Sequence, residues 1–318
     1  MLLPTDIVPA SVRTTRCCVL TLALAAVNLK LRSRERICIA SGRVRSGRKS
    51  SGRITSGLLC LAVMFLSPLP ALAQDSSGRY ISDLVVNAPD FDRQSFTAAR
   101  ELVVELEHKD IAALESFIGS TNMLTSAGSK PGRLRVTAPR RAVINRMPVL
   151  DAHLEASFVI DFDEPVVEQL VARYRQSAAA DASVASLTQF VDSMLPNKTY
   201  ARGFDIASRA AARGEGDCTE HAVLLTAASR AVGKPARTVM GAALVGYEDG
   251  LAGYGHAWTE IFVDGQWRLA DATGISRELP VFYLPLGVIT EEGPGYAFGL
   301  FEAIQRMPSR ITLVSMVP

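Results

Sequence analysis

The spacing of hydrophobic residues is mixed over residues 74–165. Short alternating or β-branched segments predict strands, and longer apolar segments favour helices. The predicted strands lie at residues 134–137, 142–144 and 154–162, and the predicted helices at 95–106 and 109–118. This part of the chain is therefore expected to form a small α+β amino-terminal region, and no chemistry is indicated in it.

From residue 166 the hydrophobic period becomes that of helices. Apolar residues recur every three or four positions along residues 166–174 and 187–195, and the second run stops at Pro196. A third helix is predicted over residues 200–213, after which Gly214 and Gly216 interrupt the pattern. The second half of the chain is thus expected to begin with a group of helices.

A capping pattern predicts where the next helix begins. Asp217 can cap its first turn, and Glu220 three residues later completes an acidic capping box. Cys218 then takes the first helical position, and Gly233 followed by Pro235 ends the helix. A thiol in that position is activated by unpaired backbone N–H groups and by the positive end of the helix dipole. Because the two nearby carboxylates oppose another anion, the thiol also needs a cationic partner.

The strongest hairpin pattern covers residues 255–270. Asp264 and Gly265 form a dipeptide that favours a two-residue type I′ turn, and aromatic and β-branched residues precede it. If the loop has only those two residues, His256 and Asp271 lie on one face of the sheet as diagonal neighbours. Their backbones are then roughly 7–8 Å apart, a distance that the two side chains can span. A bulge at the turn would instead place them on opposite faces.

Charge is distributed unevenly along the 318 residues. The first 73 positions hold 11 of the 34 Lys and Arg residues but only 2 of the 32 Asp and Glu residues. The rest of the chain therefore has 23 basic and 30 acidic groups, so the overall net charge of +2 is misleading. An excess of acidic groups argues against nucleic acid as a partner.

The basic front of the chain has the order of an export signal. Basic residues at 43–53 precede an apolar run at 58–66, and Ala71-Leu72-Ala73 supplies the small residues that a signal peptidase accepts. Residues 1–73 are therefore interpreted as a leader with a signal peptide, which predicts a periplasmic or secreted protein. The alternative is a membrane anchor, but the run is short for a bilayer, so no stable membrane insertion is expected after cleavage.

Cleavage of the predicted leader would remove most of the cysteines from the chain. Four of the five lie within the leader, at Cys17, Cys18, Cys38 and Cys60. Only Cys218 remains after cleavage, and in an oxidising compartment it is an inert buried residue, an intermolecular link or a reactive group. With His256 as base and Asp271 as orienting group, Cys218 would complete the set of groups needed for covalent acyl transfer.

These three residues lie in segments that resemble the core of the transglutaminase-like superfamily. The motifs are GDCTEHA at residues 216–222, RAVGKPAR at 230–237, GHAWTE at 255–260 and WRLADAT at 267–273. The resemblance covers roughly residues 166–285. One departure is Thr219, which follows the cysteine where the cross-linking enzymes of the family commonly have Trp.

The resemblance implies an α+β fold of the papain and transglutaminase type, with the nucleophile helix packed on an antiparallel sheet. It also implies a catalytic triad of Cys218, His256 and Asp271 in a catalytic domain at residues 166–318. The expected activity is that of an exported amide hydrolase, peptidase or acyltransferase. Such an enzyme would act on peptide or protein amides through a thioester, and no cofactor is expected.

Two alternatives stay open. The fold could serve as a binding or assembly module without turnover. In the other alternative Cys218, His221, His256 and Asp271 bind zinc, although they lack the paired spacing of structural zinc ligands.

Overall fold

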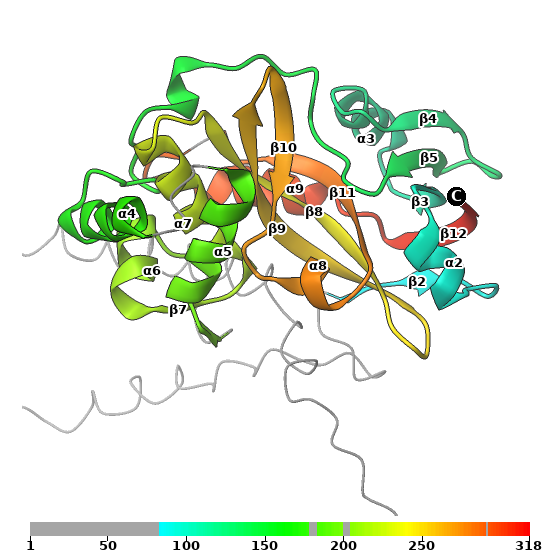
Figure 1. Cartoon of the computed structure of the whole chain (residues 1–318). Helices are drawn as coiled ribbons and strands as arrows, with labels where there is room; N and C mark the ends of the chain where they lie inside the picture. Colours follow the sequence, from blue (N-terminus) through cyan, green and yellow to red (C-terminus); the bar gives the residue numbers. More distant parts are fainter. Residues whose placement is uncertain (1–82, 178–182, 200–203, 291) are drawn as a thin grey trace, which may run out of the picture.

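The computed structural model describes residues 83–177, 183–199, 204–290 and 292–318. In Figure 1 a layer of helices lies against one side of a central sheet, and a second sheet with its own helices lies on the other side. The leader predicted at residues 1–73, and the first residues of the amino-terminal region, are outside the described residues. Within the described residues no helix is long and apolar enough to cross a membrane.

The main sheet is antiparallel and has the strand order β1-β9-β8-β11, with β10 paired to β9 as well. Its strands are β1 (Asp83–Leu84), β8 (Ala236–Gly246), β9 (Leu251–Val263), β10 (Gln266–Ala270) and β11 (Val281–Val288). Every residue of β8 is buried, because this strand lies between two others and is covered on both faces. Such double cover favours a continuous apolar strand over an alternating one.

Four helices lie on one side of the main sheet (Figure 1). They are α4 (Pro165–Gln176), α5 (Val184–Met194), α6 (Ala207–Arg213) and α7 (Cys218–Ala231). Helix α7 is the central one: it packs on β9 and β8 and is flanked by the other three. Because it is enclosed on all sides, thirteen of its fourteen residues are buried. The predicted helices at 166–174 and 187–195 are confirmed by α4 and α5.

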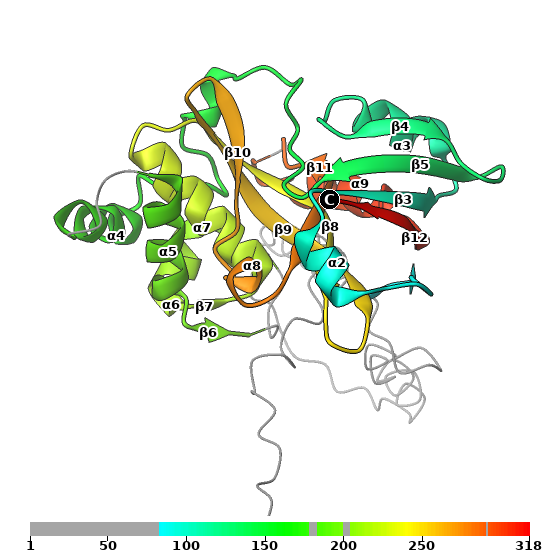
Figure 2. The same cartoon turned by 45° about the vertical axis from the view of Figure 1, so that its right-hand side comes forward.

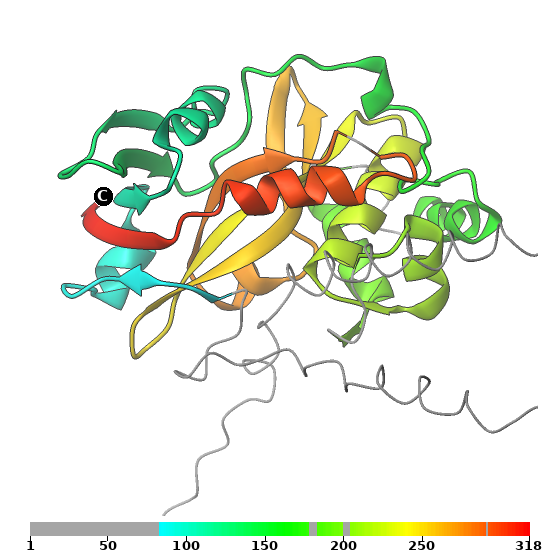
Figure 3. The same cartoon turned by 180° about the vertical axis from the view of Figure 1, so that it is seen from behind.

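The second sheet has the order β2-β12-β3-β5-β4 (Figure 2). Its strands are β2 (Val86–Asn87), β3 (Glu101–Glu107), β4 (Leu124–Ala127), β5 (Arg133–Pro139) and β12 (Arg310–Val317), and helices α2 (Arg93–Ala98) and α3 (Ile111–Ile118) accompany it. The remaining short elements are β6 (Asn197–Lys198), β7 (Glu215–Gly216), α8 (Ile275–Glu278) and a 3-10 turn at Asp151–His153. Helix α9 (Ala297–Gln305) lies against β11 and β8 (Figure 3).

The last strand of the chain lies in the sheet of the amino-terminal region. β12 pairs antiparallel with β3 and parallel with β2. Conversely β1, at the beginning of the described residues, pairs with β9 in the main sheet. Strands from both ends of the described chain therefore pair with strands on the other side of the boundary predicted near residue 165. The division of the chain into a region at 74–165 and a domain at 166–318 stays a prediction.

The helix predicted at residues 95–106 is wrong beyond Ala98. The backbone turns at Ala99, where φ is −59° and ψ is 139°, and β3 begins at Glu101. The Arg140 guanidinium donates hydrogen bonds to the carbonyls of Phe96 and Ala99, both at 2.7 Å, and so satisfies the end of α2. The segment that follows buries Leu102, Val104 and Leu106, which have the period of a strand.

Two predicted strands are also wrong. Residues 154–162 form turns and bends, and Leu154 and Phe158 expose 41% and 50% of their surface. Residues 142–144 form no strand, although the preceding Arg141 makes an isolated bridge to Tyr283. In both segments the residue pattern suits a strand, but apart from the Arg141 bridge neither segment pairs with a strand.

The predictions at residues 134–137 and 109–118 are confirmed by β5 and α3. The third helix predicted at 200–213 begins only at Ala207 within the described residues, as α6. The first residues of that prediction, 200–203, lie outside them.

Candidate active site

The first turn of α7 holds Cys218 in the predicted position. Asp217 is the N-cap, and its carboxylate accepts hydrogen bonds from the backbone N–H and the hydroxyl of Thr219 at 2.8 and 2.7 Å. The carboxylate of Glu220 in turn accepts the backbone N–H of Asp217 at 2.9 Å, which completes the capping box. Cys218 therefore begins the helix with only 6% of its surface exposed, and its position beside the dipole end is confirmed.

Glu220 has a second bond that fixes this end of the helix. Its other carboxylate oxygen accepts the backbone N–H of Asp205 at 2.8 Å, just before α6. Gly216 makes room for this carboxylate, since a Cβ there would lie 2.4 Å from the Cβ of Glu220. Burial, followed by the neighbouring Cys218 and Glu220, raises the pKa of Asp217 well above its usual value. Asp217 is thereby biased toward its neutral form, which weakens its repulsion of a thiolate.

The β9–β10 hairpin has the predicted register. Val263 pairs with Gln266, and both turn residues, Asp264 and Gly265, have positive φ angles of 52° and 74°. These angles are those of a type I′ turn. No bulge alters the parity between β9 and β10, so Asp271 lies on the same side of the sheet as His256. The His256 Nε2 and Asp271 Oδ2 atoms are 2.9 Å apart.

Cys218 completes a chain of three side chains. A hydrogen bond joins its side chain to the imidazole of His256. Because Nε2 of that ring is bound to Asp271, the bond to Cys218 uses Nδ1. The structure thus brings together all three residues that the sequence indicates, although the chain separates them by up to 53 positions.

Burial and the neighbouring charge shift the pKa of His256 in opposite directions. Burial alone would lower the pKa of His256, but the Asp271 carboxylate and the hydrogen bonds to Asp271 and Cys218 raise it to about 10. Burial likewise favours the neutral form of Asp271, yet the His256 imidazole and the bonds from Thr273 hold the pKa of this carboxyl well below its usual range. At neutral pH the pair is therefore an imidazolium bound to a carboxylate.

Two further residues bind the carboxylate of Asp271, and the sequence interpretation did not assign them to the site. The hydroxyl of Tyr283 donates to Oδ2 at 2.8 Å, while the backbone N–H and hydroxyl of Thr273 donate to Oδ1 at 2.9 and 2.7 Å. Thr273 follows Asp271 by two positions, so a local turn would have indicated it. Tyr283 lies on β11, two strands away from β9, and no local pattern points to it.

A buried ion pair supports the hairpin from behind. Arg237 on β8 and Glu260 on β9 are opposite each other in the sheet, and their side chains meet at 2.6 Å. Glu260 also accepts the backbone N–H of Ile144 at 2.9 Å, and Arg237 donates to the carbonyl of the same residue. The Arg237 guanidinium lies 3.8 Å from the centre of the Trp267 ring. This cluster attaches the segment after β5 to the strand that carries His256.

His221 has a defined tautomer. Its Nδ1 lies 2.7 Å from the carbonyl oxygen of Asp217, so Nδ1 carries the proton that is donated. Burial lowers the pKa of His221, which keeps the ring neutral. Among the described residues no group of three or more His, Cys, Asp or Glu side chains could hold a metal ion, so the zinc alternative finds no support there.

Residues 168–272 match the model of the transglutaminase-like superfamily. This part of the chain therefore carries the superfamily core, and the predicted resemblance is confirmed. The matched residues contain Cys218, His256 and Asp271, together with α7 and the β9–β10 hairpin. The fold is accordingly α+β of the transglutaminase-like type, with α7 packed on an antiparallel sheet as predicted.

Three solved structures are distantly similar. A candidate cysteine protease from Cytophaga hutchinsonii is 16% identical over 57% of this chain and 78% of its own, with a TM-score of 0.35. The periplasmic domain of TgpA from Pseudomonas aeruginosa, bound to ethylmercury, is 20% identical over 50% and 67%, also with 0.35. A TGase is 14% identical over 60% of this chain and 59% of its own, with 0.26. No curated protein matches the chain.

Proposed function

We propose that this chain is an exported, cysteine-dependent amide hydrolase or acyltransferase that acts on peptide or protein amides through a thioester. The observation that carries the proposal is the connected set of Cys218, His256 and Asp271, in which the ring is held at 2.9 Å by the carboxylate. A helix N-terminus and an imidazolium both favour a thiolate, which is the form of cysteine that attacks a carbonyl.

Acylation begins with the thiolate of Cys218 and the imidazolium of His256. The sulfur attacks the amide carbonyl carbon, and the carbonyl electron pair moves onto oxygen. The backbone N–H of Cys218, at the first position of α7, donates to that oxyanion. His256 gives its proton to the amide nitrogen, the C–N bond breaks and the amine leaves. The product is a thioester on Cys218 and a neutral imidazole.

Deacylation returns the enzyme to its starting state. Neutral His256 takes a proton from water or from an amine, which attacks the thioester carbonyl. Collapse of the second oxyanion breaks the C–S bond and releases a carboxylic acid or a new amide. Asp271 keeps the ring in the required orientation and stabilises the imidazolium in both steps. Tyr283 and Thr273 act as positioning residues, because they bind Asp271 and do not touch the reacting atoms.

The thiol itself provides a test that needs no substrate. Folded protein is treated with iodoacetamide at pH 7, and mass spectrometry follows alkylation at Cys218. The rate should exceed that of the urea-unfolded chain, because the folded site favours the thiolate. His256→Ala should slow it toward the unfolded rate. Equal or slower alkylation in the folded protein would contradict the proposal.

Turnover is measured with dimethylcasein as the amide donor. Incorporation of dansylcadaverine reports acyl transfer, and release of ammonia or of new amino groups reports hydrolysis. Cys218→Ala should abolish both signals while the far-ultraviolet circular dichroism stays unchanged. Full activity in that variant would exclude the thioester route, and reactive thiol without turnover on any amide would favour a binding module.

A further inference from the structure

A groove with a volume of about 870 Å³ follows the outer edge of β10. All the residues from Gln266 to Asp271 line it on one side, and Val184, Thr188 and Gln189 of α5 line it on the other. Strand β10 and helix α5 are neighbours in the fold (Figure 1). Asp271 is among the residues that line the groove, and its carboxylate holds His256, so the groove lies two side chains away from the sulfur of Cys218.

The strand that borders the groove has an unpaired edge. In a hairpin with a two-residue turn, residues 266, 268 and 270 bond across to β9, so the backbone groups of Trp267 and Leu269 face outward. Arg141 confirms this direction, since it donates to the Leu269 carbonyl at 3.5 Å. Within the described residues the Trp267 N–H, the Trp267 carbonyl and the Leu269 N–H have no partner. Such an edge can accept an added strand.

Positive charge predominates along the groove. Arg141, Lys234 and Arg268 line it, and none of them has a carboxylate partner in the part of the chain that the structure describes. A fourth cation, Arg277, is already bound by Asp192.

The acidic residues of the groove do not balance these cations. Asp271 is committed to its bonds with His256, Tyr283 and Thr273. Asp264 is exposed at the tip of the hairpin. The groove therefore offers unpaired positive charge to a ligand that carries carboxylates.

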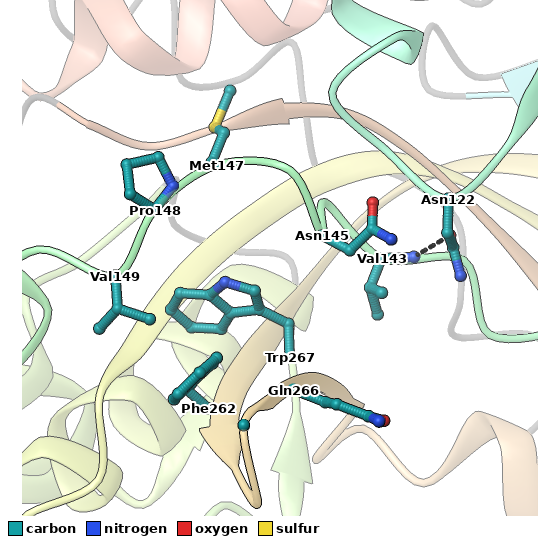
Figure 4. A pocket seen from close by; sticks show the side chains of 10 residues that line it. Asn122, Val143, Asn145, Met147, Pro148, Val149, Phe262, Gln266 and Trp267 are labelled. Carbon is teal, nitrogen blue, oxygen red and sulfur yellow. Dashed lines mark hydrogen bonds between the residues drawn. The ribbon is translucent and has the colours of Figure 1, made fainter.

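A pocket of about 620 Å³ with mixed walls adjoins the groove near the turn of the hairpin, and Asn122, Asn145 and Gln266 line it beside apolar side chains. Figure 4 shows Trp267 and Phe262 on one side of it and Met147, Pro148 and Val149 on the other. The two cavities share Trp267, Gln266, Asn122 and Val143 in their walls. A chain that leaves the groove at this end thus meets the rings of Trp267 and Phe262, against which an apolar side chain can pack.

We propose that the groove binds an extended, acidic segment of the substrate, which adds to the free edge of β10 and places an apolar side chain in the Trp267 pocket. The inference rests on the proposed function and names the class of substrate for the same site. Five strand residues span about 17 Å at about 3.3–3.4 Å each, so the bound segment has about five residues. Its carboxylates face Arg141, Arg268 and Lys234, while its backbone bonds to Trp267 and Leu269.

The inference is tested by binding alone, with Cys218→Ala protein that cannot turn a ligand over. The probe is a fluorescein-labelled octapeptide of alternating glutamate and threonine with a leucine at each end, followed by fluorescence anisotropy. Peptides with glutamine or lysine in place of glutamate serve as comparisons. The acidic peptide should bind at least about tenfold more tightly than the glutamine peptide, and this margin should shrink as salt is added.

Variants locate the binding on the molecule. Arg141→Glu combined with Arg268→Glu should weaken the acidic peptide at least about tenfold and improve binding of the lysine peptide. Arg310→Glu reverses the charge of another exposed arginine, at the beginning of β12, and as the control it should leave both affinities unchanged. Replacing the terminal leucines with asparagine should weaken binding through loss of the apolar contact.

Peptide chemistry distinguishes strand addition from attraction by charge alone. N-methylation at successive positions should weaken binding at every second residue, because only alternate N–H groups face β10. Equal affinity for the acidic and lysine peptides, or no effect of the double charge reversal, would refute the groove as an acidic-segment site. A uniform effect of N-methylation would refute strand addition. These binding measurements do not depend on the alkylation rate of Cys218, which tests the proposed function. Failure of the groove proposal can therefore be distinguished from failure of the proposed function.

Discussion

The carboxylate of Asp271 is the most heavily bonded group of the candidate site. Four hydrogen bonds converge on it, from the His256 ring, the Tyr283 hydroxyl, and the backbone and hydroxyl of Thr273. Such bonds fix the position of the carboxylate and keep it ionised although it is buried. The orientation of His256 therefore depends on residues that touch neither the thiol nor a substrate.

Removing one of these bonds tests that dependence. Tyr283→Phe leaves Oδ2 of Asp271 with His256 as its remaining partner, and should lower the free energy of unfolding by about 1.5–3 kcal/mol. The alkylation rate of Cys218 should fall as well, because a less firmly held carboxylate supports the imidazolium less well. Urea denaturation and the iodoacetamide assay measure the two effects.

Tyr174→Phe is the matched control. Tyr174 is also buried, and its hydroxyl bonds to the hydroxyl of Ser186 at 2.7 Å in the helical layer, away from Asp271. This variant should lose stability but keep the alkylation rate of the wild type. If both tyrosine variants slow alkylation equally, Tyr283 has no specific effect on the site.

The pKa of His256 predicts how stability depends on pH. The folded value of about 10 lies above the value of 6.5 for an unperturbed histidine, so the folded state binds this proton more tightly. The resulting stabilisation is complete below pH 6.5 and is lost as the pH rises through about 10. The difference in unfolding free energy between the wild type and His256→Gln should therefore shrink over that interval. A difference that stays constant from pH 6 to pH 10 would show that the ring is not protonated in the folded protein.

At the scale of elements, the ion pair between Arg237 and Glu260 joins β8, β9 and the segment that follows β5. Both side chains are essentially fully buried, and Glu260 also binds the Ile144 N–H. Removing one partner from such a pair leaves an uncompensated buried charge. Removing one partner should therefore lower the free energy of unfolding by more than the intact pair contributes to it.

Arg237→Met should destabilise the protein by about 3–5 kcal/mol. The double variant with Glu260→Leu should lose less than the sum of the two single variants, because it leaves no unpaired charge. It still leaves the Ile144 N–H without its acceptor, which costs about 1–3 kcal/mol.

The control for this ion pair is Arg277→Met. Its partner is Asp192, and the Arg277 side chain is 48% exposed, so the loss should be at most about 1 kcal/mol. Chemical denaturation of the four variants provides the comparison. Equal losses for Arg237→Met and Arg277→Met would mean that burial of the first pair has no energetic consequence.

For the whole molecule, one hydrophobic core connects the two sheets. It combines Leu102 and Val104 of β3 and Ile311 of β12 with Leu244 of β8 and Phe282 of β11. Because a single core contains strands of both sheets, we expect them to unfold together. The two tryptophans, Trp258 and Trp267, lie in the main sheet and can report on a change made in the second sheet.

Ile311→Ala tests this coupling. Ile311 is fully buried, so its truncation should cost about 2–5 kcal/mol. The unfolding midpoints from tryptophan fluorescence and from far-ultraviolet circular dichroism should shift together. Val314→Ala, on the same strand but 45% exposed, should change stability by about 0.5 kcal/mol or less. Separate midpoints for the two probes would show that the sheets unfold independently.

Local patterns in the sequence determined most of the candidate site. The capping box that begins α7 involves Asp217 and Glu220, three positions apart, and the hairpin register follows from the turn at Asp264 and Gly265. Both depend on residues that are close in the chain, where backbone geometry leaves few choices. The sequence alone could therefore place Cys218 at a helix N-terminus and put Asp271 on the side of His256.

Only the tertiary structure decided the contacts between distant segments. Tyr283 reaches Asp271 because β11 pairs with β8. In the second sheet, β12 returns from the end of the chain to pair with β3. The sequence pattern predicts a helix over residues 95–106, but β3 forms from Glu101, because β12 and β5 supply its hydrogen bonds and bury one of its faces. Short apolar segments suit either structure, and the partner that covers them makes the choice.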